Sequence, residues 1–191
     1  MRFFYDTEFL EDGRTIELIS IGIVCEDGRE YYAVNSDMPV DRIRSERWLM
    51  NNVVRHLPLR VPIPERAWAD NQTPAVVLDL RDTRVKPKWV IANEVREFIL
   101  GPRDSDDLPY VELWAWYSAY DHVALAQLWG RMIDLPEGMP MFTRDLKQEC
   151  ARLGDPRLPD QLEGEHDALA DARQNLVRWQ ALQEIEAKGN S

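Results

Sequence analysis

The stretch MRFFYDTEF, residues 1–9, places two acidic side chains directly after a run of aromatic ones. The aromatic run is typical of a buried strand, and Asp6 and Glu8 follow it at once. Side chains alternate between the two faces of a strand, so these two acids point the same way, together with Phe4. Two like charges close together beside an apolar core repel each other and lose hydration. The stretch therefore predicts a strand with two unfavourably placed acids, which indicates a role for them other than packing.

Composition places the chain among ordinary globular proteins. Its 191 residues are 45% hydrophobic and 30% charged, enough to bury one sizeable core. No apolar run approaches the roughly 18 residues that a membrane span needs, and the first residues lack the pattern of a signal peptide. Cys25 and Cys150 lie far apart without metal-type spacing, which favours free thiols. We expect a single domain over residues 1–191, located in the cytoplasm and without a membrane partner.

The charge of the chain is negative overall and unevenly spread. A net charge of −11 argues against a protein that coats long nucleic acid through a basic surface. Residues 40–66 nevertheless hold six arginines against three acids, whereas residues 104–171 hold fifteen acids against five bases. One interpretation is an acidic, cation-binding half facing a basic segment that guides a polyanion. The other is a solvated acidic surface, and charge alone does not separate the two.

Periodicity and turn residues predict the order of elements. Residues 2–35 read as an antiparallel meander of three strands, because β-branched and aromatic runs alternate with Gly turns. The rest predicts helices at 39–57, 87–100, 119–131, 143–153 and 167–188, a strand at 110–118 after an acidic turn at 104–109, a Pro/Gly linker at 135–140, and a Pro-rich loop at 58–88 with a short strand at 75–80. Strands followed by helices alternating with a further strand predict an α/β sheet with helices packed on it.

A second awkward acid is Asp121, in WAWYSAYDHVALAQLW (114–129). It opens a mostly apolar helix, where an acid can simply complement the helix dipole or cap the helix, worth about 1 kcal/mol. The aromatic residues around it, Trp114, Trp116 and Tyr120, are expected to pack in the core. His56 and His122 are expected to be ordinary surface or core histidines rather than ligands.

The third acidic group lies in GEHDALADARQNLVRW (164–179). His166 and Asp171 are five residues apart, about 140° around a helix, so on one helix they would not share a face. Either Asp167 and Asp171 form one acidic stripe, or Asp167 caps the helix while His166 reaches in from the preceding loop. Because Ala-Leu follows Asp167, the second interpretation is favoured.

These motifs, taken in order, resemble a known superfamily. DTEF (6–9) with ELISIGIV (17–24), AYDHVAL (119–125) and HDALADA (166–172) are similar to the three motifs of the DEDDh 3′→5′ exonucleases, which include oligoribonuclease, ribonuclease T and polymerase proofreading domains. Within that group, the compact size and the run DTEFLEDGRTIELISIG are most similar to the polyadenylate-specific exoribonucleases of actinobacteria. Members often carry His-Asn shortly before the second-motif acid, whereas this chain has Trp-Tyr-Ser-Ala at 116–119.

The resemblance implies a ribonuclease-H-like fold, a mixed five-stranded sheet flanked by helices. It also implies two Mg²⁺ ions, with Mn²⁺ as a plausible substitute, and it leaves Asp167 as a cap. It assigns His166 as the general base and four carboxylates as metal ligands: Asp6, Glu8, Asp121 and Asp171. This set suits the chemistry, because hard cations prefer oxygen ligands and histidine titrates near neutral pH.

The expected activity is hydrolysis of single-stranded RNA from its 3′ end to nucleoside 5′-monophosphates, with adenylate-rich tails as the substrate and a homodimer as the assembly. The choice of RNA, the adenylate preference and the dimer follow from the resemblance alone. The alternatives are a DNA 3′→5′ exonuclease or proofreading module with the same site, and a non-catalytic nucleic-acid-binding module on the same fold.

Substrate contacts are less well defined by the sequence. Phe9 and Leu10 follow the acidic pair directly and either pack on the terminal base or serve in ordinary packing. Four arginines are candidates for guiding the strand: Arg42, Arg44, Arg47 and Arg55.

Overall fold

The computed structural model describes residues 1–63, 73–102 and 110–189. Within them, one mixed sheet runs in the order β4-β3-β2-β1-β5-β6. Its strands are β1 Arg2–Glu11, β2 Ile16–Cys25, β3 Glu30–Asn35, β4 Val85–Lys86, β5 Glu112–Ala115 and β6 Arg144–Asp145. The predicted α/β class and mixed sheet are confirmed.

The predicted meander is also confirmed, since β1 pairs antiparallel with β2, and β2 with β3. The remaining pairs, β1 with β5, β3 with β4 and β5 with β6, are parallel. The described residues hold one strand more than the five expected. The short edge strands β4 and β6 have two residues each, too few to leave a periodic pattern in the sequence.

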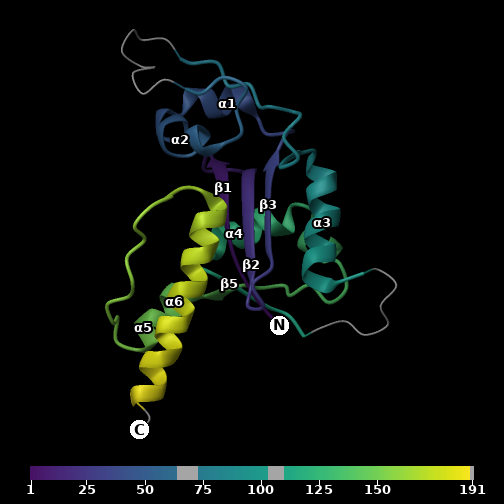
Figure 1. Cartoon of the computed structure of the whole chain (residues 1–191). Coiled ribbons are helices and arrows are strands. Elements are labelled where there is room, and N and C mark those ends of the chain that lie inside the picture. The colour runs from purple at the N-terminus through teal and green to yellow at the C-terminus, as the bar shows by residue number, and fades with distance from the viewer. Residues whose placement is uncertain (64–72, 103–109, 190–191) are drawn as a thin grey trace.

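Helices cover both faces of this sheet. The α-helices are α1 Val40–Ser45, α2 Arg47–Asn52, α3 Lys88–Leu100, α4 Ala119–Ala126, α5 Leu146–Arg152 and α6 Ala168–Gly189, with 3-10 turns η1 Val54–His56 and η2 Met132–Asp134. Apolar residues of α3 and α4 pack on one face, those of α5 and α6 on the other, and α1 and α2 close one end. Figure 1 shows α6 running along β1 and β2, with α3 beside β3.

Several predicted boundaries were wrong. The helix expected at 39–57 is broken into α1, α2 and η1, because the backbone at Glu46 is extended. The strand expected at 75–80 is reduced to an isolated bridge between Leu59 and Leu78. Helix α4 stops five residues before the predicted end at 131, and β5 covers only the centre of 110–118. The acidic turn expected at 104–109 lies outside the described residues.

Strand β1 is the centre of the packing. Phe3 and Tyr5 belong to the core under α3 and α4, whereas Phe4 faces the opposite way, its ring centroid 5.5 Å from that of Trp179 on α6. This alternation explains how an aromatic run can be buried on both faces of one strand. The same alternation continues into the acidic part of β1.

The start of α6 lies unusually close to the sheet. A Cβ atom at Gly22 of β2 would come within 2.3 Å of the carbonyl oxygen of Ala168, so only glycine permits this approach. Gly22 is the cross-strand partner of Asp6. Further along α6, the Asn175 amide donates a buried hydrogen bond of 3.0 Å to the carbonyl oxygen of Tyr5. The helix is thereby held against the acidic part of β1.

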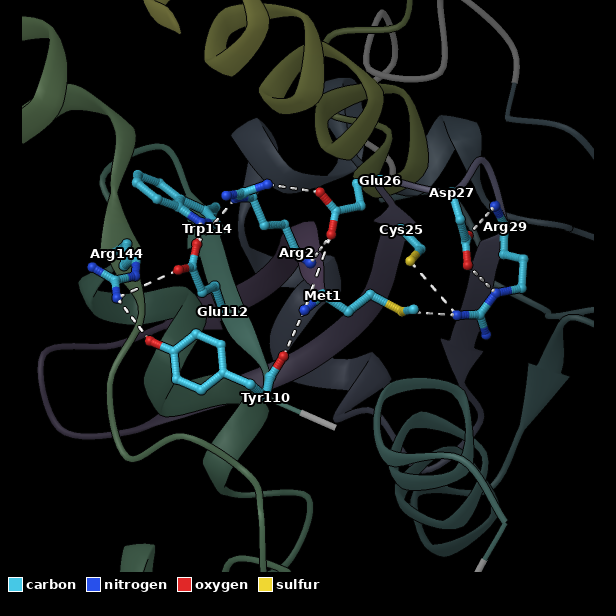
Figure 2. A network of polar contacts seen from close by, with 10 residues as sticks. All are labelled: Met1, Arg2, Cys25, Glu26, Asp27, Arg29, Tyr110, Glu112, Trp114 and Arg144. Carbon is cyan, nitrogen blue, oxygen red and sulfur yellow. Dashed lines mark hydrogen bonds and ion pairs between the residues drawn. The ribbon is translucent and has the colours of Figure 1, made fainter. Parts of the chain in front are cut away.

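A polar network joins the opposite end of β1 to its neighbours (Figure 2). Arg2 donates to Glu26 after β2 at 2.9 Å and to Glu112 of β5 at 3.2 Å, and Glu112 also accepts from Trp114. These ion pairs lie at the surface, where each contributes at most about 1 kcal/mol. They connect the first residues of β1 to β5 and to the turn after β2. None of the described helices is both long and apolar enough to cross a membrane.

Candidate active site

An open cavity of about 510 Å³ lies where β1, α4 and the start of α6 meet. Its lining includes all five residues assigned by the resemblance: Asp6, Glu8, Asp121, His166 and Asp171. They come from three stretches of chain that are more than a hundred residues apart at the extremes. The fold thus gathers the three motifs at one place.

The two acids of β1 and the acid of α4 are linked through Thr7. Asp6 and Glu8 both face the cavity, as their spacing predicted, and Glu8 is only 8% exposed. Asp121 is 6% exposed and accepts two hydrogen bonds from Thr7, at 2.8 Å from the backbone N–H and 2.7 Å from the hydroxyl. Since Thr7 stands between Asp6 and Glu8, these bonds fix Asp121 relative to both.

The histidine and the last acid are arranged around the start of α6. Asp167 caps this helix by accepting from the backbone N–H groups of Leu169 and Ala170, at 3.1 and 3.0 Å. His166 lies in the loop before the helix, and its backbone N–H donates to Asp171 at 3.0 Å. The second of the two sequence interpretations is therefore confirmed, and the stripe of Asp167 and Asp171 is not.

The loop that carries His166 is held in an unusual conformation. His166 has a φ of 65°, which non-glycine residues seldom adopt. Its ring and the Trp48 ring of α2 form a T-shaped pair, with centroids 4.8 Å apart. Gln161 from the same loop donates to Asp171 at 2.6 Å. The backbone conformation and the Trp48 contact thus hold the imidazole beside the acids, while Gln161 orients Asp171.

Burial and mutual repulsion raise the pKa values of the carboxyl groups. The pKa of Glu8 is raised to about 8, first by burial and then by the charges of Asp171 and Asp121. Burial also raises the pKa of Asp121 to about 6, against the lowering effect of its hydrogen bonds from Thr7. The pKa of Asp6 is raised by burial and then by the charges of Asp121 and Glu8. Burial raises the pKa of Asp171 too, against the lowering effect of its hydrogen bonds from Gln161 and the His166 backbone N–H. Without a cation, the ionised form of these carboxyl groups is disfavoured.

The donor set fits a hard divalent cation. Ligand atoms of Glu8, His166 and Asp171 lie within 4.8 Å of one another, while Asp6 and Asp121 share the cavity but not that tight group. Carboxylate oxygens are the ligands that Mg²⁺ and Mn²⁺ prefer, and a cation would relieve the repulsion that raises the pKa values. The cavity is therefore a candidate metal centre.

The two expected substrate residues are not placed alike. Phe9 lines the cavity, its ring centroid 5.9 Å from that of Tyr120. Leu10 is 3% exposed and belongs to the core under α1 and α2, so it is not brought to the cavity. A shift in the β1–β2 register between Glu8 and Phe9 accompanies this change of surroundings.

The arginine candidates do not line the cavity in the described part of the chain. Arg42 pairs with Asp12 and Glu17, and Arg44 pairs with Asp41. Among the histidines expected to be structural, His122 contacts Thr143 at 3.0 Å, and His56 is exposed.

Sequence reasoning missed several lining residues. Trp114 is buried as expected, but Trp116 and Tyr120 line the cavity, and Tyr120 is 52% exposed. The rest of the missed lining is Thr7, Trp48, Tyr117, Gln161, Glu165 and Arg178. The stretch Trp-Tyr-Ser-Ala at 116–119 lies where the resembled superfamily often has His-Asn. That departure was the one signal in the sequence that pointed to the lining residues Trp116 and Tyr117.

A mixed α/β sheet that brings several carboxylates and a histidine to one open cavity is the arrangement expected of a metal-assisted hydrolase. Comparison with known proteins narrows that class. The family described as the 3′-5′ exoribonuclease Rv2179c-like domain matches residues 1–183. The chain therefore belongs to this family of 3′-5′ exoribonucleases.

Two relatives from Mycobacterium tuberculosis are each 44% identical to the chain over 189 residues. They are the proteins named 3′-5′ exoribonuclease Rv2179c, of strain H37Rv, and 3′-5′ exoribonuclease MT2234.1, of strain CDC 1551. The match covers 99% of this chain and 97% of each relative, so it includes the whole candidate site.

Proposed function

We propose that this chain is a metal-dependent exoribonuclease of the DEDDh type. It removes nucleotides from the 3′ end of single-stranded RNA and releases them as nucleoside 5′-monophosphates. The observation that carries the proposal is the meeting of Asp6, Glu8, Asp121, His166 and Asp171 in one cavity. The family match and the names of the two relatives support the reaction and its direction.

The four carboxylates would hold two Mg²⁺ ions, or Mn²⁺ in their place. Bound there, the two ions supply activation of the attacking water and stabilisation of the leaving oxygen. The protein contributes the geometry: the Thr7 hydrogen bonds orient Asp121, and Gln161 with the His166 backbone N–H orients Asp171. Both acids are thus fixed before any ligand arrives.

His166 is assigned as the general base. An imidazole titrates near neutral pH and can accept the proton of the attacking water. Its ring lies beside Glu8 and Asp171 and against Trp48, on a loop rather than on α6 itself. The same proximity also allows His166 to be a metal ligand, which a substitution can distinguish.

Aromatic side chains surround the acids and suit a terminal nucleotide. Phe9 and Tyr120 form one edge-to-face pair in the lining, and Trp48 stands next to His166. Bases stack on such rings whatever their sequence, each stack worth about 1–3 kcal/mol. The adenylate preference rests on the resemblance, since no described contact selects adenine.

The remaining expectations are a homodimer and a cytoplasmic location. The dimer rests on the resemblance alone. Both cysteines, Cys25 and Cys150, are free and buried, which supports a reducing compartment.

Digestion of a homopolymer panel tests the substrate class. RNA and DNA oligomers of matched sequence should both be offered with Mg²⁺, and the products resolved by size. Faster loss of RNA is expected, with poly(A) degraded before the other homopolymers. Faster loss of DNA would support a DNA exonuclease with the same site.

The non-catalytic alternative has a different signature. If every single-stranded oligomer stayed intact with Mg²⁺, while the wild type and Asp6→Asn bound them equally well, the chain would be a binding module. Retention of all five motif residues supports the enzyme instead.

A further inference from the structure

Arg178 is a cation beside the acidic cavity to which no role has been given. It follows Asp171 by seven residues on α6, so the two share a helix face with Asn175 between them, and their Cα atoms are about 10 Å apart along the axis. Side chains on a helix tilt toward its N-terminus. The guanidinium therefore points back toward the acids, and it lines the cavity with them.

Its contacts give it no direct ion pair, although the charges of Asp171, Asp6 and Glu165 act on it from a greater distance. The guanidinium lies over the Trp116 ring, 4.5 Å from the centroid, and Nη1 donates to the Asn175 side-chain oxygen at 3.2 Å. Within the described part of the chain, no carboxylate reaches it within the 4.0 Å of an ion pair. A half-buried charge without an ionic partner is costly, which makes an anionic ligand the natural complement.

A second cavity of about 380 Å³ adjoins the first and shares four lining residues with it: Arg178, Trp116, Gln161 and Glu165. Its other described basic group, Lys147, already pairs with Asp155. Another acid of its lining, Asp160, pairs with Arg157. Arg178 therefore remains as the unpaired cation at the boundary between the two cavities.

We propose that Arg178 binds the phosphate on the 5′ side of the penultimate nucleotide, where the RNA strand passes from the acidic cavity into the second one. The assignment rests on the proposed exoribonuclease function. The scissile phosphate would lie among the carboxylates, whereas Arg178 lies two helical turns beyond Asp171, where the first cavity adjoins the second. A guanidinium fork held flat on an indole ring is well suited to grip a phosphate with two hydrogen bonds.

Two dinucleotides that differ only in this phosphate test the assignment. One is a ribodinucleotide with a 5′-hydroxyl, and the other carries a 5′-phosphate. For the wild type, kcat/KM should be about tenfold or more higher for the phosphorylated one, as expected for hydrogen bonds to a charged group. In Arg178→Gln the ratio of the two values should fall to near one, whatever change both substrates share. Arg178→Lys, which keeps the charge but loses the fork, should give an intermediate ratio.

Arg173→Gln is the matched control, because Arg173 lies on the same helix, is exposed and pairs with Glu30. It should keep the wild-type ratio. If the ratio of the two kcat/KM values stayed at the wild-type level in Arg178→Gln, the assignment would be overturned and the proposed function would stand. If the wild type hydrolysed neither dinucleotide nor longer RNA, the proposed function would fall, and the assignment with it.

Discussion

At Glu8, burial and the charges of Asp171 and Asp121 raise the carboxyl pKa to about 8. The pKa values of Asp6, Asp121 and Asp171 are raised as well. The metal-free site therefore holds protons that isolated carboxyl groups would have released. We expect a bound cation to offset the cost of gathering these acids. Two properties of the purified protein follow: its stability depends on pH, and its stabilisation by Mg²⁺ grows with pH.

The first is a fall in stability with rising pH. Between the unfolded pKa of Glu8, near 4.5, and its folded value of about 8, the folded state binds more protons than the unfolded one. The free energy of unfolding of the metal-free protein should therefore decrease as pH rises through that window. Thermal melts from pH 5 to pH 8 check this, and the rise in Tm on adding Mg²⁺ should grow with pH.

Glu8→Gln provides the matched variant. It removes the raised group, so its metal-free Tm should depend less on pH and exceed that of the wild type at pH 8. Its response to Mg²⁺ should weaken. A wild-type Tm that rises from pH 5 to pH 8 without metal would contradict this picture of the site.

His166→Ala separates the two roles open to this residue. As the general base, its loss should reduce kcat by about a hundredfold or more while leaving Mg²⁺ affinity nearly intact. Single-turnover rates and a metal titration by calorimetry measure the two effects. A large loss of metal binding in this variant would make His166 a ligand instead.

At the scale of elements, the site depends on how closely α6 approaches β2. Gly22 lies under the carbonyl group of Ala168 and opposite Asp6, so the helix that carries Asp171 packs directly on the strand next to the acidic pair. The Asn175 bond to the Tyr5 carbonyl oxygen then holds the helix lower down. These two contacts set the distance between Asp171 on α6 and the acids of β1.

Gly22→Ala should therefore act on stability and activity together. The added methyl group would meet backbone atoms at 2.3–2.4 Å, which have to move. A loss of about 1–3 kcal/mol in the free energy of unfolding is expected from such overpacking, with weaker Mg²⁺ binding. Gly189→Ala, where a Cβ meets nothing within 4 Å, is the control and should change neither. Denaturant unfolding and metal titration of both variants decide the matter.

Elements with a strong local pattern were predictable from the sequence. The meander, α3 with Pro87 at its start, and α6 with Asp167 as its cap all have residues whose periodicity or capping chemistry is local. The break at Glu46 and the short strands β4 and β6 were not predictable. The two short strands depend on pairing with distant residues, such as Val85 with Val34.

The same distinction holds for the candidate site. The four acids stood out because they lie beside apolar runs, His166 was assigned by the resemblance, and all five reach the cavity. Tyr120 and Arg178 did not stand out, since an aromatic residue or an arginine on a helix is ordinary until the opposing surface is known. Leu10 looked suitable by its position after Glu8, but it is turned into the core under α1 and α2.

At the scale of the whole molecule, one sheet joins two parts with different tasks. The start of β1 is tied to β5 and to the turn after β2 by the network around Arg2, away from the acids. The later part of β1 carries the acids toward α4 and α6 and the cavity between them. The two ends of one continuous strand thus hold an ion-paired network and a group of acids, and we propose that the acids serve to hydrolyse RNA.

The most direct test follows single-stranded RNA labelled at its 5′ end during digestion with and without Mg²⁺, by the wild type and by Asp6→Asn. The account predicts a ladder of labelled products that shortens one nucleotide at a time from the 3′ end, with unlabelled nucleoside 5′-monophosphates accumulating. Chelation of the metal or Asp6→Asn should abolish it. Immediate release of a labelled mononucleotide, or an unchanged ladder after chelation or in Asp6→Asn, would contradict it.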